Sequence, residues 1–172
     1  MTLATPIPGE LDDAEAARYV GRYLADLEKV VGGADDAAIV RGLRALPGGA
    51  EGALGLVAAG IPEAFRPQYA GGETGRVLFF LETDGVDIPL CLEILPDGCR
   101  LIEPDEQAEA EIRVSLPTFL KIAFKFMDGN DAYVSGLTEL KGDVFLATNL
   151  DRWFDVPTAV RGPEPADRAE SL

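Results

Sequence analysis

Apolar residues recur at spacings of three and four along the first third of the chain. Between Leu11 and Val31 this spacing predicts an amphipathic helix, which a Gly-Gly pair ends. The same spacing over 35–46 predicts a second helix, followed by a Pro-Gly-Gly break. Residues 51–65 predict a third helix, whose middle is weakened by glycines. The chain therefore begins with helices.

The periodicity changes after Gly72. Residues 76–83 are apolar on both faces, which predicts a strand that is covered on both sides. Strands at 88–95 and 99–103 are expected next, each after a turn that contains glycine. Residues 108–115 alternate between apolar and polar side chains, as in a strand with one buried face.

A helix predicted from Ser115 to about Asp128 is apolar nearly all the way round. Ser115 is a suitable N-cap, and Pro117 fits the first turn because the N–H that proline lacks has no partner there. Only a narrow polar stripe interrupts the apolar surface: Thr118, Lys121 and Lys125. Such a helix must hide most of its surface. Either it packs in a core between the sheet and the N-terminal helices or a second subunit, or part of it lines a cavity for an apolar ligand.

The last third of the chain adds three elements. Residues 128–131 are expected to form a loop and 132–140 a strand, and 144–154 predict a closing helix with Asp143 as its N-cap. The order is helices, a meander of strands, then helix, strand and helix. This order predicts an α+β fold, with helices packed on an antiparallel or mixed sheet.

Composition narrows the classes of function. The chain has 172 residues, 47% of them hydrophobic, which suits one domain with an added subdomain and a real core. Its formal net charge of −15 excludes nucleic acid as a partner and disfavours anionic membrane surfaces. No apolar segment is long enough to insert stably into a bilayer, and the N-terminus has no basic, signal-like region. We therefore expect a soluble, cytoplasmic protein.

The reactive side chains are few. The chain has no histidine, and its two cysteines, Cys91 and Cys99, do not make a zinc site by themselves. They either face each other across a hairpin or, as we favour, remain a reduced pair of small buried side chains. We predict no catalytic residue, no cofactor and no metal. Glu82 and Glu93 interrupt apolar strands, and we expect each to face solvent or to pair with an arginine rather than to act as an acid or base in a cavity.

The run EIRVSLPTFLKIAFKFMDGNDAYVSGLTELKGDVFLATNLDRWF resembles the C-terminal half of sterol carrier protein type two domains. The resemblance is carried by the order of an amphipathic strand, a helix, a loop, a strand and a closing helix. The matching residues are Met127, Gly129, Ala132, Gly136, Leu137, Gly142, Phe145, Leu146 and Leu150. The resemblance implies a sheet of five strands with helices on one face, enclosing an apolar tunnel for fatty acyl chains, sterols or similar lipids.

This resemblance divides the chain into four parts. Residues 1–10 are expected to be a flexible lead-in, 11–49 an N-terminal helical extension, 50–156 the sterol-carrier-like lipid-binding domain and 157–172 a flexible tail. The residues that it implies around the tunnel are Leu78, Phe80, Leu90, Leu92, Phe119, Ile122, Ala123, Phe126, Met127, Phe145, Leu150 and Trp153. Lys121 and Lys125 either face solvent or hold an anionic head group at the tunnel mouth.

Three functions remain in competition. The leading hypothesis is a non-catalytic protein that binds or carries a hydrophobic small molecule in the tunnel, with burial of apolar area as the driving force. The second is an enzyme of the same fold that cyclises or isomerises an apolar, polyketide-like substrate. The third is a ligand-free interaction module. The N-terminal helices are the predicted interface of a homodimer.

Overall fold

The elements of the chain follow the predicted order with two additions. The computed structural model describes residues 6–32 and 35–155, so the predicted tail at 157–172 and the first half of the lead-in lie outside the described residues. The chain opens with the helices α1 (Asp13–Val31), α2 (Asp36–Ala45), α3 (Gly49–Ala64) and α4 (Pro67–Ala70). The strands β1 (Gly75–Thr83), β2 (Val86–Leu95), β3 (Gly98–Ile102) and β4 (Ala110–Ser115) come next. The last elements are α5 (Leu116–Ala123), α6 (Gly129–Val134), β5 (Thr138–Gly142), α7 (Val144–Asn149) and the 3-10 turn η1 (Leu150–Trp153).

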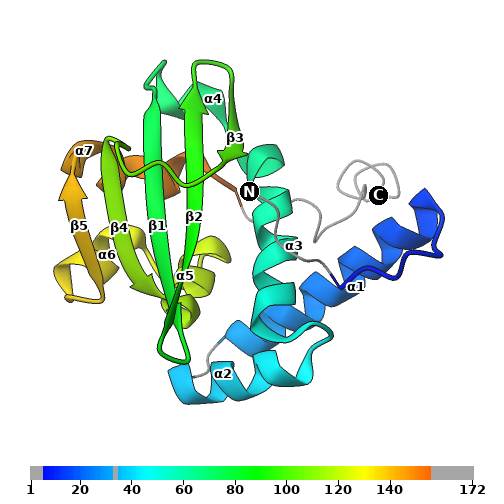
Figure 1. The fold of residues 1–172 in the computed structure, drawn as a ribbon. Coiled ribbons are helices and arrows are strands. Elements are labelled where there is room, and N and C mark those ends of the chain that lie inside the picture. The colour runs from blue at the N-terminus through cyan, green and yellow to red at the C-terminus, as the bar shows by residue number, and fades with distance from the viewer. Residues whose placement is uncertain (1–5, 33–34, 156–172) are drawn as a thin grey trace, which may run out of the picture.

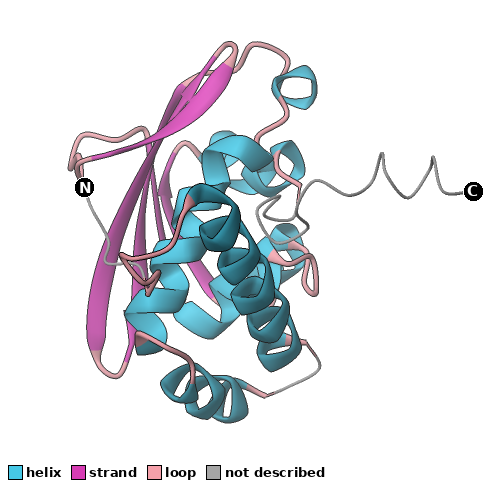
Figure 2. Cartoon of the chain, turned by 90° about the vertical axis from the view of Figure 1, so that its right-hand side faces the viewer, coloured by secondary structure: helices cyan, strands magenta, loops and turns pink. Residues whose placement is uncertain are grey.

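The strands form one mixed sheet in the order β3-β2-β1-β4-β5. The central strand β1 pairs antiparallel with β2 and parallel with β4, opposite Val77 and Ala110 at one end. Helices cover one face of this sheet, and the other face carries the connection from β3 to β4 (Figure 1, Figure 2). The predicted α+β fold, with five strands and helices on one face, is confirmed.

Local side-chain bonds explain where the first helices begin. Asp12 accepts a hydrogen bond from the backbone N–H of Glu15 at 2.8 Å, and Asp35 accepts one from that of Ala38 at 2.8 Å. Each aspartate is thus an N-cap that satisfies one of the free N–H groups of the first turn. The three predicted N-terminal helices are confirmed, with ends that shift by two residues or fewer.

The N-terminal helices α1 and α2 pack against α3 and α5. Their contact is made by side chains with almost no exposed surface: Leu24, Leu27, Val31, Ile39 and Leu43. Tyr23 supports the same region, because its hydroxyl donates a hydrogen bond to the carbonyl oxygen of Pro47 at 2.8 Å. Burial raises the pKa of Tyr23 to about 12, so this phenol is a donor throughout the neutral range. The extension is therefore part of the domain core.

Helix α5 lies between this extension and the sheet, which explains its apolar surface. Leu116 and Leu120 are fully buried, and the ring of Phe119 meets that of Phe79 on β1 edge to face, with centroids 5.5 Å apart. One of its two predicted polar-stripe lysines is used in the same assembly: Lys121 Nζ lies 3.1 Å from Asp36 Oδ1 on α2. Lys121 therefore ties α5 to the extension and does not lie at the cavity described below.

Two predictions for residues 124–140 are wrong. Helix α5 ends at Ala123, well before Asp128, and Lys125 has a left-handed backbone with φ of 65°. The expected loop at 128–131 and strand at 132–140 are replaced by α6 and a later strand β5. The cause is local, because the carboxylate of Asp128 accepts hydrogen bonds from the N–H groups of Asn130 and Asp131 and caps a helix. The β-branched and aromatic residues of α6 gave the misleading strand pattern.

The two cysteines are free and buried. Cys99 on β3 lies opposite Ile94, on the helix-covered face, while Cys91 is three positions from Ile94 on β2 and so faces the other side of the sheet. A disulfide between them would require one side chain to pass through the sheet. The expected reduced pair is confirmed.

Removal of one buried side chain of α5 tests this packing. We expect Leu120→Ala to lower the free energy of unfolding by about 2–5 kcal/mol, because the cavity that it leaves is closed on both sides. The matched control is Leu137→Ala, since Leu137 is 46% exposed and its truncation should cost about 1 kcal/mol or less. Urea unfolding of both variants gives the two values. Equal losses for the two variants would contradict the buried position of α5.

Candidate ligand cavity

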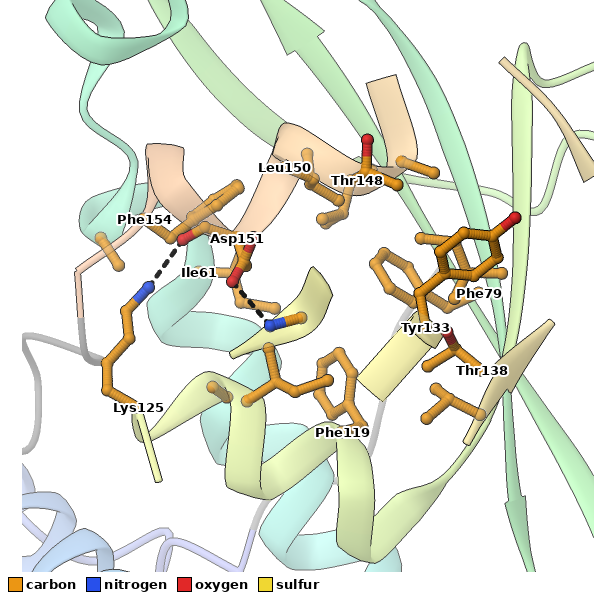
Figure 3. Close-up of a pocket in the computed structure, with 18 of the residues that line it drawn as sticks. Ile61, Phe79, Phe119, Lys125, Tyr133, Thr138, Thr148, Leu150, Asp151 and Phe154 are labelled. Atoms are coloured by element: carbon orange, nitrogen blue, oxygen red, sulfur yellow. Dashed lines mark hydrogen bonds between the residues drawn. The ribbon is translucent and has the colours of Figure 1, made fainter. Parts of the chain in front are cut away.

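An apolar cavity lies on the helix-covered face of the sheet. Its walls come from α3, from the inner face of β1, β2, β4 and β5, from α5, and from the segment that contains α6, α7 and η1 (Figure 3). The aliphatic and aromatic residues that line it are Val57, Ile61, Ala64, Phe79, Leu92, Ile112, Val114, Phe119, Ile122, Ala123, Tyr133, Leu140, Ala147, Leu150 and Phe154. Lys125, Gly129, Thr138, Thr148, Asp151 and Asp155 complete the lining.

Two volumes describe this space. The part that the centre of a water molecule can reach measures about 110 Å³, whereas all the space between the lining side chains, including the mouth that opens to solvent, measures about 870 Å³. The smaller value is the one to compare with closed cavities, and a closed apolar cavity of about 150 Å³ accepts benzene. The cavity as it stands therefore fits a small ring or a short length of chain. A longer ligand requires the mouth region or a movement of the wall.

A pair of bonds closes one side of the cavity. Lys125 Nζ donates to the carbonyl oxygen of Asp151 at 2.6 Å, and the carboxylate of Asp151 accepts from the N–H of Gly129 at 2.9 Å (Figure 3). Beside them, the carboxylate of Asp155 lies 3.2 Å from the Arg66 guanidinium. The polar groups on this side are thus already bonded within the protein. They hold η1 to the segment that follows α5.

Five of the twelve residues predicted around the tunnel line this cavity. They are Leu92, Phe119, Ile122, Ala123 and Leu150. Leu90 and Trp153 are buried in the core without lining it, and Met127 is half-buried in the turn after α5. Phe126 and Phe145 are 50% and 61% exposed. Phe126 leaves the apolar face because α5 ends three residues earlier, and there its ring approaches Gly32 at the end of α1.

The predicted residues of β1 are on the wrong face of the strand. Side chains alternate along a strand, and it is Val77, Phe79 and Leu81 that join the helix-covered core. Leu78 and Phe80 face the other side, where the Arg113 guanidinium lies over the Phe80 ring at 4.3 Å. Because β1 is apolar at both sets of positions, the sequence pattern alone could not choose between them. The pairing of Phe79 with Leu90 on β2 fixes the choice.

Other lining residues were missed for identifiable reasons. Tyr133, Thr138 and Leu140 lie in the segment whose elements were mispredicted, so their inward side could not be assigned. Val57 and Ile61 lie on α3, which was predicted only as a helix without a role at the tunnel, although its apolar surface all round was a signal of burial on more than one side.

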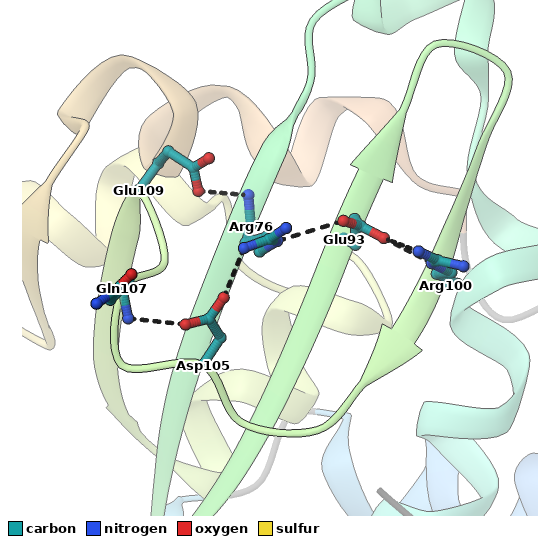
Figure 4. A network of polar contacts seen from close by, with 6 residues as sticks. All are labelled: Arg76, Glu93, Arg100, Asp105, Gln107 and Glu109. Carbon is teal, nitrogen blue, oxygen red and sulfur yellow. Dashed lines mark hydrogen bonds and ion pairs between the residues drawn. The ribbon is translucent and has the colours of Figure 1, made fainter.

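The outer face of the sheet carries a network of charges, which lines an open, polar pocket (Figure 4). The Glu93 carboxylate lies 3.3 Å from Arg76 Nε and 2.6 Å from Arg100 Nε, and Arg76 Nη1 lies 2.7 Å from Asp105 Oδ2. The hydrogen bonds from Arg100 and Arg76 lower the pKa of Glu93. The expected arginine pairing of Glu93 is thus confirmed. Glu82 is exposed on the same outer face, so neither carboxylate faces the cavity.

Two other features are absent from the residues that the structure describes, a metal site and a membrane-spanning helix. No three side chains among the acidic residues and cysteines of 6–32 and 35–155 cluster closely enough to hold a metal ion. No helix within those residues is both long and apolar enough to span a bilayer.

Comparisons with known proteins find a similarity for part of the chain. Residues 73–155, just under half of the chain, match the SCP-2 sterol transfer family. This range covers the whole sheet and every helix from α5 onward, and it begins after α1, α2, α3 and α4. No curated protein matches the chain.

Three solved structures illustrate the similarities. The sec-alkylsulfatase Pisa1 from Pseudomonas is 18% identical with a TM-score of 0.47, over 58% of this chain and 15% of the sulfatase. A conserved hypothetical protein from Thermus thermophilus, described as possibly sterol carrier protein, is 17% identical with a TM-score of 0.47, over 63% of this chain and 88% of that one. Palmitated SCP2L2 from Aedes aegypti is 21% identical with a TM-score of 0.46, over 56% and 85%. This chain thus spans only a small part of the sulfatase.

The outer-face network predicts a pH-dependent contribution to stability. Because the folded-state pKa of Glu93 is below its ordinary value of 4.5, its ion pairs stabilise the fold above that value, and this contribution is lost as the pH falls through the lowered pKa. Glu93→Gln should therefore unfold at lower urea concentration than the parent at pH 7, with the difference shrinking below pH 4.5. Glu82→Gln, on the same face but without an ion pair, is the control and should change little at pH 7. A difference for Glu93→Gln that stays constant down to acid pH would contradict the assignment.

Proposed function

We propose that residues 73–155, which match the SCP-2 sterol transfer family, form a domain of that family and that the chain binds an apolar small molecule of the lipid or sterol class. The binding site is the cavity between the sheet, α3, α5 and the α6–α7–η1 segment. The observation that carries the proposal is the lining, which is almost entirely aliphatic and aromatic, with its charged groups confined to one side and bonded within the protein. Burial of apolar surface drives binding, at about 25 cal/mol per Å² before the cost of ordering.

The arrangement favours binding over catalysis. An enzyme that cyclises or isomerises an apolar substrate needs a group that moves a proton at the cavity. The two carboxylates considered for that task, Glu82 and Glu93, lie on the opposite face of the sheet. At the cavity itself, the carboxylate of Asp151 accepts the N–H of Gly129, which is a structural use. An open cavity also disfavours a ligand-free interaction module, whose interior side chains would fill it.

Uptake of a neutral fluorescent hydrocarbon tests the proposal. We expect diphenylhexatriene to bind the full chain with a saturable rise in fluorescence and a stoichiometry of one, because one of its two phenyl rings fits the cavity while the triene and the other ring can lie in the mouth region. Ala147→Phe should weaken this binding at least about tenfold, which corresponds to about 1.4 kcal/mol, because the new ring occupies the lining.

The control for this experiment is Ala25→Phe. Ala25 is also helical but is exposed on α1, none of whose residues line the cavity, so its enlargement should leave the affinity unchanged. Absence of saturable binding to the parent chain, or equal loss in both variants, would contradict the proposed site.

Self-association is a further part of the proposal, together with a cytoplasmic location. The first half of α1 projects beyond α3 (Figure 1), and Tyr19 and Val20 remain only partly buried there. We expect the N-terminal helices to pair in a homodimer, so light scattering on the full chain should give twice its mass of 18.3 kDa. Replacement of Tyr19 and Val20 by serine should return the monomer mass, and a monomer mass for the parent at high concentration would contradict the dimer.

A further inference from the structure

Thr138 is a buried polar residue whose hydroxyl has no partner. Only two polar side chains among the described residues are buried, Thr118 at 2% and Thr138 at 8% exposure. The hydroxyl of Thr118 is bonded to that of Ser115 at 3.0 Å. The hydroxyl of Thr138 makes no hydrogen bond to any residue that the structure describes. The two threonines are thus alike in burial and different in bonding.

An unbonded hydroxyl at such a place calls for an explanation. Nearly all buried polar atoms in proteins have a hydrogen-bond partner, and leaving one without a partner costs about 1–3 kcal/mol. Thr138 begins β5 opposite Val114, where valine would serve the sheet equally well. Its side chain lines the cavity, whose wall around it is apolar. The partner that is missing within the protein is therefore one that the cavity can supply.

A second hydroxyl lies on the same side of the cavity. Tyr133, on α6, is 40% exposed and lines the cavity, and its phenol also makes no hydrogen bond to the described residues. Figure 3 places Tyr133 and Thr138 together at one side and the Lys125–Asp151 pair at the other. One side of the cavity thus offers two unused neutral groups, each able to donate or accept.

The opposite side is poorly suited to an anionic ligand. Lys125 supplies the one ammonium of the lining, and it is bonded to the carbonyl oxygen of Asp151. The carboxylates of Asp151 and Asp155 also line the cavity, and Asp155 is paired with the Arg66 guanidinium at 3.2 Å, so these cations and carboxylates balance and leave no net positive charge for an anionic head group. A fatty acid carboxylate would therefore gain no net electrostatic attraction on this side, while it would lose its hydration on entering an apolar lining.

We propose that the ligand of this cavity is a neutral apolar molecule with a hydroxyl or carbonyl oxygen, which Thr138 binds directly and Tyr133 approaches from the rim. This inference rests on the proposed binding function and specifies its ligand class. Thr138 is then the specificity-determining residue. It selects an oxygen-bearing ligand over a pure hydrocarbon by one hydrogen bond, and the balanced charges opposite offer no compensation for the burial of an acid.

Three ten-carbon probes separate these contributions: 1-decanol, decane and decanoate. Each displaces diphenylhexatriene from the full chain in a competition titration at neutral pH. We expect 1-decanol to bind the parent most tightly. In Thr138→Val the affinity for 1-decanol should fall about three- to tenfold, the worth of one neutral hydrogen bond, while that for decane changes less than about twofold. Thr138→Ser retains the hydroxyl and should keep the preference for the alcohol.

The outcomes distinguish the two proposals. Equal weakening of 1-decanol and decane in Thr138→Val, or no weakening of either, would overturn the role of Thr138. Tighter binding of decanoate than of 1-decanol would overturn the neutral ligand class. If the parent binds the hydrocarbon probes without any preference for the alcohol, the proposed function stands and this inference falls. If the parent binds none of the probes, both fall. Valine keeps the β-branched shape of threonine, so Thr138→Val should fold, and its unfolding curve verifies this.

Discussion

Burial of α5 on both sides is the constraint on which the rest of the structure depends. A helix that is apolar almost all the way round must be buried on more than one side. The domain therefore needs a second layer on the side of α5 that faces away from the sheet. The N-terminal helices supply that layer, with Leu24 and Leu27 fully buried, and the ion pair of Lys121 with Asp36 uses the one polar edge of α5. Because one side of α5 packs on the N-terminal helices, the helix is held in place while its Phe119 and Ile122 line the cavity.

Because side chains alternate along each strand, the sheet keeps its charged residues on one face and its apolar residues on the other. The outer face takes the charges, and the connection of residues 103–109 is fastened across it by Asp105 and Arg76. The inner face takes the apolar residues and a single buried threonine. This division lets a strongly acidic chain contain an apolar cavity, because its carboxylates sit in solvent or beside arginines and do not lie among the residues that a ligand would contact.

The fold could be predicted from the sequence further than the site could. Helix periodicity, N-cap residues and strand alternation are local signals, and they gave the three N-terminal helices, the start of α5, the start of the closing helix, the first four strands and the α+β class. Two steps needed three-dimensional information. The choice between Phe79 and Phe80 depends on which face of β1 the helices cover, and β1 is apolar on both. The helix α6 depends on a cap by Asp128 that competes with a strand-like pattern in Tyr133 and Val134, and its misassignment hid Thr138.

The cavity also affects the stability of the domain. A space of about 110 Å³ that the protein itself does not fill is less favourable than a filled wall, because the apolar side chains around it lack packing contacts there. Replacement of a small wall residue such as Ala123 or Ala147 by a larger one would recover part of those contacts in a single mutational step. The same substitution would leave less space for a ligand, so stability and ligand volume oppose each other at these two positions.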